Sequence, residues 1–290
     1  MPRTTPKRPR LALILAALAA LAAACGRRDG PRPAPAPRVV SIVPAATAVV
    51  VALGEADHLV GVTRYGHAPG VPVVGDTNPP PERVLAQEPD LVLVGDYPSQ
   101  APTREKLAAL GVETLPLPFV TLADMRAATL TLGARLGATP EAEALVARLD
   151  AALAAGRARA TERGPVKVLV VYGTEPGFVY TTAGGDHVSE LLAAVGGVNV
   201  VHDGGLTVRL GLEAVLARAP ELVLHVAPDA ALPDDAAALA YWRQALPDLP
   251  AARRGQVRVW PDDHLAQNGP WLADAVAPLA ALLDRAAAAR

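Results

Sequence analysis

One short stretch of the chain occurs twice. The first copy, at 82–94, reads ERVLAQEPDLVLV, the second, at 213–225, reads EAVLARAPELVLH, and eight of the thirteen positions are identical. In each copy a helix is predicted to begin at an acidic residue and to end before a proline, and an apolar run follows. A run without polar alternation is typical of a parallel strand that is covered on both faces. Two distant copies of this unit predict two similar lobes.

The acidic residues that begin the two copies, Glu82 and Glu213, have two interpretations. A carboxylate in the first turn of a helix is stabilised by the helix dipole, and this alone could explain both. Alternatively, two equivalent lobes each present one carboxylate to a shared partner.

Strands alternate with helices through the rest of the chain, which predicts an α/β fold with a parallel sheet in each lobe. The first lobe covers 38–138 and the second 164–290. The predicted strands are 39–43, 58–63, 71–74, 91–94, 112–115, 166–171, 178–182, 222–225 and 257–260. The predicted shorter helices are 45–54, 104–110, 186–196, 241–245 and 271–289. The segment 196–199 is expected to be a loop.

The segment 139–163 predicts one long helix that joins the lobes. Thr139 can cap it, Pro140 suits its first position, and apolar residues recur at helical spacing from Leu145 to Leu153. Such a helix would be about 36 Å long. Gly156 weakens it without necessarily breaking it.

The N-terminus has the features of a targeting segment. Basic residues precede an apolar run at 11–24 that is too short to span a bilayer, and Cys25, the only cysteine, follows. Residues 1–24 are similar to a bacterial lipoprotein signal, with Cys25 as the lipidated residue and 25–37 as a Pro-rich tether. The alternative is an ordinary signal peptide in which Cys25 has no role. Either interpretation places the protein outside the cytoplasm, and the first anchors it to a lipid bilayer.

Composition narrows the classes of partner. The formal net charge is −2 and no basic tract lies outside the N-terminus, which argues against nucleic acid. Aromatic residues make up only 3% of the chain, so we expect a core of Ala, Val and Leu. One cysteine allows no intramolecular disulfide.

Together these segments resemble the Fe/B12-type periplasmic binding proteins, which deliver metal chelates to ABC importers. The resemblance is carried by RVVSIVPAAT at 38–47, LVGVTRY at 59–65, the two repeat copies, and Gly-Gly-x-Asn at 196–199. It implies a monomer with two α/β lobes, a long bridging helix and a ligand cleft between the lobes. It also implies that Glu82 and Glu213 dock onto the dimeric permease.

The sequence departs from this family at several positions. Ala48 follows Thr47 where the family usually has glutamate. Asp76 and Thr207 stand in loops where cobalamin binders commonly carry tryptophan, and the segment 75–77 lacks the tyrosine of haem binders. The expected cargo is therefore a metal chelate, cobalamin or a ferric siderophore, rather than haem. No permanently bound cofactor is expected.

Ligands of open α/β sheets bind beyond the carboxyl ends of the strands. This rule, with the resemblance, predicts a set of ligand-binding residues: Pro44, Ala45, Tyr65, Asp76, Tyr97, Tyr180, Arg209, Asp263 and His264. The two tyrosines Tyr65 and Tyr180 could instead be core residues, Asp263 a residue of a solvated turn, and Arg209 a surface arginine.

A zinc receptor and an enzyme are the alternatives to a protein that transports a chelate. A zinc receptor needs about three converging histidines, but His225 is expected in a buried strand and His187 at a helix start. His67 and His264 are the histidines most able to reach the cleft. An enzyme is disfavoured because no serine lies in a G-x-S-x-G motif and no G-x-x-x-x-G-K phosphate loop is present. The sequence therefore predicts a binding protein without a metal site of its own.

Overall fold

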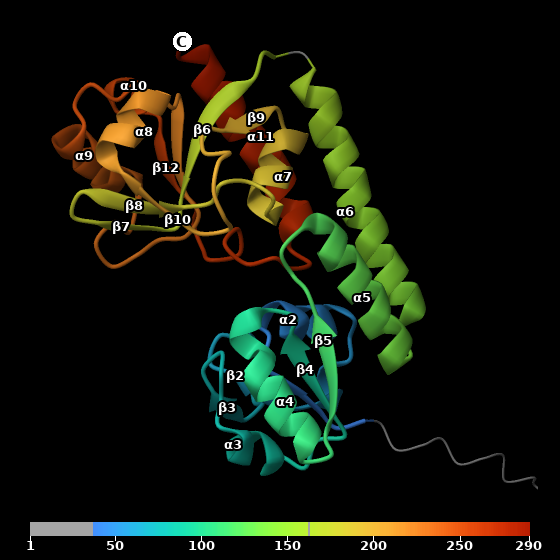
Figure 1. Ribbon diagram of the computed structural model, residues 1–290. Helices are drawn as coiled ribbons and strands as arrows, with labels where there is room; N and C mark the ends of the chain where they lie inside the picture. Colours follow the sequence, from blue (N-terminus) through green and yellow to red (C-terminus); the bar gives the residue numbers. More distant parts are fainter. Residues whose placement is uncertain (1–36, 162) are drawn as a thin grey trace, which may run out of the picture. The chain divides into compact units, whose positions relative to one another are not determined.

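Two parallel β-sheets organise the computed structural model, which describes residues 37–161 and 163–290 (Figure 1). The predicted signal segment, Cys25 and nearly all of the tether lie outside the described residues. Within the described residues, no helix combines the length and apolar character that crossing a membrane requires.

The N-terminal lobe is built on five parallel strands in the order β3-β2-β1-β4-β5. The strands are β1 (Val39–Ser41), β2 (Leu59–Thr63), β3 (Val73–Gly75), β4 (Leu91–Gly95) and β5 (Glu113–Leu117). The helices are α2 (Pro44–Ala52), α3 (Pro81–Leu85) and α4 (Ala101–Ala109). All five residues of β4 are buried, as its unbroken apolar sequence predicts.

The C-terminal lobe has four parallel strands in the order β12-β11-β6-β9. They are β6 (Val166–Val171), β9 (Gly197–Asn199), β11 (Leu222–His225) and β12 (Val257–Val259). The helices are α7 (His187–Ala194), α8 (Leu212–Arg218), α9 (Asp235–Ala245), α10 (Pro250–Arg253) and α11 (Leu272–Ala288). The prediction of a loop at 196–199 was wrong, because 197–199 pair with β6 as the edge strand β9.

A second, antiparallel sheet departs from the predicted plan. The strands β7 (Gly173–Glu175), β8 (Phe178–Thr181) and β10 (Val208–Gly211) form this separate sheet in the order β10-β8-β7. A tight Pro176-Gly177 turn, with Gly177 at φ +83°, folds β8 back onto β7. The strand predicted at 178–182 exists, but it does not belong to the parallel sheet.

A long helix joins the lobes, as predicted. Helix α6 (Thr139–Ala160) packs against the preceding helix α5 (Leu122–Leu136) and against α7 and α11 of the C-terminal lobe (Figure 1). Gly156 permits this packing, because a Cβ there would lie 2.9 Å from Cγ1 of Val276 on α11. Helix α5 was not among the predicted helices, although Thr121 and Asp124 form a capping box at its start.

The repeated sequence shares two structural features in both lobes, although α8 has seven residues and α3 has five. The residues before the two prolines, Glu88 and Ala219, have φ values of +48° and +46° and are the only non-glycine residues with positive φ in the described parts of the chain. The carboxylates of Asp90 and Glu221 then accept the backbone N–H at the start of the neighbouring central strand, at 2.8 and 2.9 Å. The two copies therefore share the turn before the proline and the contact of the acidic residue that follows it.

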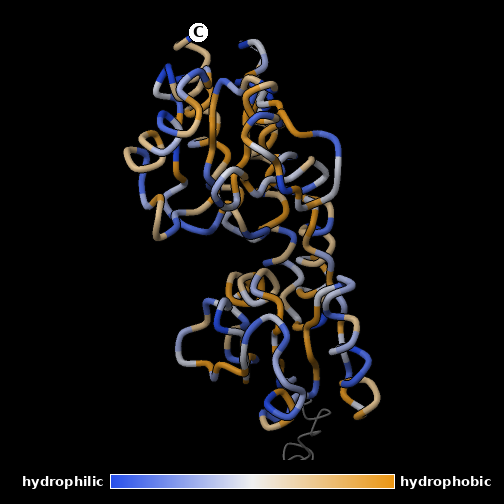
Figure 2. Tube along the Cα trace, turned by 60° about the vertical axis from the view of Figure 1, so that its left-hand side comes forward, coloured by the Kyte–Doolittle hydropathy of each residue, from blue (hydrophilic) through white to orange (hydrophobic). Residues whose placement is uncertain are grey.

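The core is built from small aliphatic side chains. Valine, leucine and alanine supply nearly all of the buried hydrophobic residues, as the composition predicts. Figure 2 shows the apolar stretches running through the interior of both lobes. Burial of this apolar surface stabilises the sheets and holds the strand ends in place.

Candidate functional site

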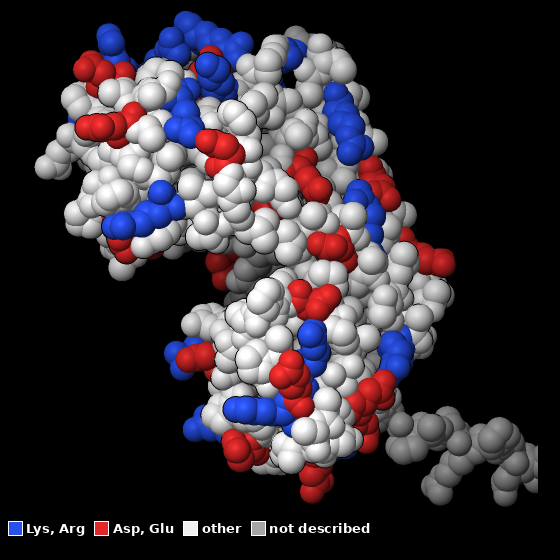
Figure 3. All heavy atoms as spheres, viewed as in Figure 1, with Lys and Arg blue, Asp and Glu red and all other residues white. Residues whose placement is uncertain are grey.

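A cleft between the lobes is the candidate site (Figure 3). Its pocket has a volume of about 530 Å³, within the roughly 300–1,000 Å³ of small-molecule sites. The lining residues are Val43, Pro44, Ala45, Tyr65, Thr77, Asn78, Tyr97, Ser99, Gln100, Phe119, His187, Ala266, Gln267 and Asn268. No aspartate, glutamate, lysine or arginine is among them.

The N-terminal wall of the cleft consists of the segments that follow the strands. Pro44 follows β1, Tyr65 follows β2, Asn78 follows β3, Tyr97 follows β4 and Phe119 follows β5. This is the arrangement expected for the carboxyl edge of a parallel sheet.

Gln100 ties three of these segments together. Its side chain is buried, and its Nε2 donates to the carbonyl of Thr77 at 2.8 Å and to that of Ile42 at 3.5 Å. Its Oε1 accepts the N–H of Gly95. A single amide therefore fixes the relative positions of the loops after β1, β3 and β4.

The two cleft tyrosines differ in exposure. Tyr65 is 48% exposed, so its ring is available to a ligand. Tyr97 packs on Gly95, where a Cβ would lie 2.4 Å from the ring. Burial raises the pKa of Tyr97, and the nearby carboxylates of Asp124 and Asp96 act in the same direction, so the phenol stays protonated at neutral pH.

The C-terminal wall is anchored by His187 at the start of α7. The main-chain N–H of His187 donates to the carbonyl of Val120 at 2.8 Å, and its Nε2 lies 3.1 Å from the carbonyl of Leu265. A carbonyl only accepts, so Nε2 carries the proton. Burial lowers the pKa of His187, which keeps the ring neutral.

The segment 120–122, which follows the cleft residue Phe119, leads from the N-terminal lobe into α5. Asn268 Nδ2 donates to the carbonyl of Thr121 at 2.8 Å, and the N–H of Leu122 donates to Glu190 at 2.6 Å. Together with the hydrogen bond from His187 to Val120, these contacts attach the C-terminal lobe to the segment 120–122.

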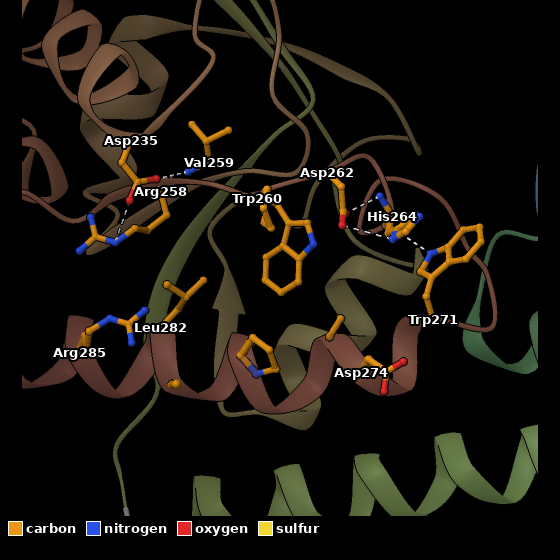
Figure 4. Close-up of a pocket in the computed structure, with 14 residues that line it drawn as sticks. Asp235, Arg258, Val259, Trp260, Asp262, His264, Trp271, Asp274, Leu282 and Arg285 are labelled. Atoms are coloured by element: carbon orange, nitrogen blue, oxygen red, sulfur yellow. Dashed lines mark hydrogen bonds and ion pairs between the residues drawn. The ribbon is translucent and has the colours of Figure 1, made fainter. Parts of the chain in front are cut away.

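A larger cavity, about 660 Å³, lies within the C-terminal lobe between α11 and the segment that follows β12 (Figure 4). All of its lining residues come from that lobe, so it does not lie where the two sheets converge. We therefore take the cleft as the ligand site, although it is the smaller of the two.

The family whose description is "Periplasmic binding protein" matches residues 39–264. The chain belongs to this family. The resemblance found in the sequence is thereby confirmed, as are the two-lobed α/β fold and the absence of an enzymatic role. It is an extracytoplasmic binding protein.

Several relatives of this periplasmic binding protein are known. The vitamin B12-binding protein of Vibrio cholerae serotype O1 is 27% identical over 257 residues, covering 84% of this chain and 88% of that protein. The structure of the periplasmic vitamin B12 binding protein BtuF of Vibrio cholerae has a TM-score of 0.72 at 25% identity, covering 87% of this chain and 98% of the other. That of a periplasmic heme binding protein from Pseudomonas aeruginosa has a TM-score of 0.69 at 30% identity, covering 84% and 91%.

The predicted site residues fall into two groups in this binding protein. Pro44, Ala45, Tyr65 and Tyr97 line the cleft, and the other five do not. Asp76 forms an ion pair with Arg64 next to the cleft. Tyr180 and Arg209 lie on the antiparallel sheet, where both contact Glu175, at 2.8 and 3.5 Å. Asp263 accepts a hydrogen bond from Gln267, and His264 faces the larger cavity.

The placement of the site residues depends on strand pairing, which the sequence pattern predicts only in part. Tyr180 and Arg209 belong to the sheet that folds back as a hairpin, so they do not lie at a parallel strand end. The rule of strand ends would also have found Asn78 and Phe119. Gln100 and Asn268 have no local signal, because their roles depend on contacts with distant segments. Gln267 donates to Asp263, four residues earlier, but no sequence motif marks it.

The two repeat glutamates are exposed on the surface. Glu82 lies in the first turn of α3 and Glu213 in the first turn of α8. In Figure 1 both helices lie on the side of the molecule away from α6. Neither carboxylate forms an ion pair with any residue of the described ranges.

The histidines do not converge on one point. His225 is buried at the end of β11 and His187 at the start of α7, as predicted. In residues 37–161 and 163–290, no group of three or more His, Cys, Asp or Glu side chains is placed to hold a metal ion. His67 and His264 do meet, with ring centroids 6.3 Å apart.

Proposed function

We propose that this binding protein captures a cobalamin-type metal chelate in the cleft and delivers it to an ABC import permease. The observation that carries the proposal is the chemical character of the cleft, whose lining is apolar and aromatic with neutral amide and hydroxyl groups. Such a lining suits a large flat ligand that is rimmed by neutral polar groups.

Charge distinguishes the candidate cargoes. Haem carries carboxylates, and many ferric siderophores are anionic, so both are best bound by arginine or lysine. The cleft lining contains neither residue. Cobalamin has carboxamides around its ring, and these can pair with side chains such as Asn78 and Gln267. The names of the vitamin B12-binding relatives support the same choice, whereas those of the heme-binding relatives support a porphyrin.

Binding can be tested with the full chain purified in detergent. We expect cyanocobalamin to quench the intrinsic tryptophan and tyrosine fluorescence saturably, and hemin and a ferric catecholate siderophore to bind at least tenfold more weakly. A Tyr65→Ala, Tyr97→Ala double variant should lose cobalamin binding, whereas Tyr241→Phe, on α9 away from the cleft, should not. Tighter binding of hemin, or full binding by the double variant, would overturn the assignment.

We infer that the exposed Glu82 and Glu213 dock the loaded protein onto the two halves of the permease. Equivalent helices carry them, and charges at the rim of an interface steer association and set its orientation. Reversing both to lysine should abolish uptake and leave cobalamin affinity unchanged. Glu143→Lys, an exposed change on α6, is the matched control. Normal uptake by the double reversal would remove the docking role.

We also propose a lipid anchor at Cys25, which lies outside the described residues. The support is the cysteine's position directly after the apolar run at 11–24. Cys25→Ser should release the protein from the membrane fraction of its host, and mass spectrometry of the wild-type N-terminus should show acyl chains. An unmodified cysteine would contradict the anchor.

A further inference from the structure

Two histidines from different lobes face each other beside the ligand pocket. His67 lies in the connection between β2 and β3, and His264 in the connection between β12 and α11. Their ring centroids are 6.3 Å apart with an interplanar angle of 90°. Neither ring is part of the cleft lining. The pair is therefore a feature separate from the proposed cargo site.

His264 is held in a defined orientation. Its ring stacks on that of Trp271, with centroids 4.4 Å apart, and its Nδ1 lies 3.3 Å from Oδ2 of Asp262 (Figure 4). When the proton is on Nδ1, next to this carboxylate, the lone pair of Nε2 is free. A histidine that is oriented by a carboxylate in this way is the usual arrangement around a protein-bound metal ion.

His67 provides a second imidazole from the N-terminal lobe. Its side chain is exposed, and it has no hydrogen bond or ion pair to any residue that the structure describes. Metal–nitrogen bonds of about 2.0–2.1 Å place the ring centres of two imidazoles on one ion about 5–6.5 Å apart. The observed separation of His67 and His264 falls in this range.

We propose that His67 and His264 bind one divalent transition-metal ion between the lobes. Neutral imidazole favours zinc, copper and nickel over magnesium or calcium. Because the described residues offer no third ligand of the usual types, water completes the coordination and the ion exchanges readily. An ion held by both lobes ties them together next to the cleft, so it slows the release of cargo.

The experiment uses the full chain with Cys25→Ser, so that the only thiol does not compete for metal. Zinc is titrated by competition with a chromophoric chelator, and copper(II) is examined by electron paramagnetic resonance. We expect one zinc site, at least tenfold weaker in His67→Ala and in His264→Ala, and unchanged in His202→Ala, whose histidine is also exposed. Asp262→Asn should weaken binding by about 10–100-fold. The copper spectrum should show two nitrogen ligands.

Two outcomes would overturn the proposal. Wild-type zinc affinity in His67→Ala would mean that the lobes are not joined by the ion. Equal affinity in all the histidine variants would mean that the pair binds no metal. Circular dichroism of each variant verifies that the fold is retained. No cobalamin is present in these titrations, so the result is independent of the cargo assignment.

Discussion

The indole Nε1–H of Trp242 on α9 donates a hydrogen bond to Nε2 of His225 at the end of β11, at 2.9 Å. Both side chains are buried, with exposed fractions of 0% and 2%. Because the indole can only donate, His225 must be neutral, with its proton on Nδ1. Burial lowers the pKa of His225 to about 4.

This hydrogen bond makes the stability of the protein depend on pH. In the unfolded chain His225 takes up a proton below about pH 6.5, whereas in the folded chain it does so only near pH 4. Stability is therefore lost as the pH falls through this interval. We expect His225 to lower the free energy of unfolding by about 2 kcal/mol between pH 7 and pH 5.

The contribution of His225 can be isolated by urea unfolding at several pH values. His225→Gln keeps a hydrogen-bond acceptor for Trp242 but does not titrate, so its unfolding free energy should fall less steeply with acidity. The pKa of His187 is also lowered by burial, so the unfolding free energy of both proteins keeps some dependence on pH. Identical slopes for the wild type and the variant would contradict the prediction.

The left-handed residues before the two repeat prolines, Glu88 and Ala219, should be sites of stabilisation. A non-glycine residue at φ near +50° destabilises the folded state by about 1–2 kcal/mol, and glycine removes this strain. Glycine also increases the conformational entropy of the unfolded chain, which offsets part of the gain. Glu88→Gly and Ala219→Gly should each raise the unfolding free energy by about 0.5 kcal/mol. Ala151→Gly, in the middle of α6, should lower it by about 1 kcal/mol. Thermal unfolding of the three variants measures the difference, and a loss at both repeat sites would be inconsistent with strain.

Gly95 should be essential to the shape of the cleft. A methyl group at this position would lie 2.4 Å from the ring of Tyr97 and 2.9 Å from Oε1 of Gln100. Gly95→Ala should therefore displace the ring and weaken chelate binding at least tenfold in a fluorescence titration. Gly173→Ala, where the nearest atom is 3.7 Å away, is the control. Unchanged affinity in Gly95→Ala would show that Tyr97 does not contact the ligand.

The contact between α7 and the first residue of α5 should contribute to stability. Glu190 accepts the N–H of Leu122, the first residue of α5, and Leu122 is buried. Glu190→Ala leaves this donor without a partner, so it should lower the unfolding free energy by about 1–2 kcal/mol. Glu143→Ala, an exposed change on α6, should have little effect. Denaturant unfolding of both variants checks this, and equal stabilities would argue against the contact.

Much of the fold could be predicted from sequence because its signals are local. The apolar runs of β4 and β11 each follow a proline and an acidic residue, and a parallel strand needs little more to be recognised. The long helix α6 follows from its period and from Pro140. Helix α5 was missed even though its capping box is also local, and β9 was missed because a three-residue edge strand has almost no pattern.

The sequence by itself determined the duplicated helix–strand unit, the parallel sheets and the residues at most strand ends, because these depend on neighbours within a few positions. The tertiary structure alone decided which of those ends meet at one cleft, and it brought Asn268 to Thr121 and His264 to His67. Such contacts join residues far apart in the chain, and they arise only when two lobes pack on α5 and α6. These contacts are short polar contacts, so a small rotation of one lobe would separate them. The relative orientation of the lobes cannot be predicted from the periodicity of the sequence.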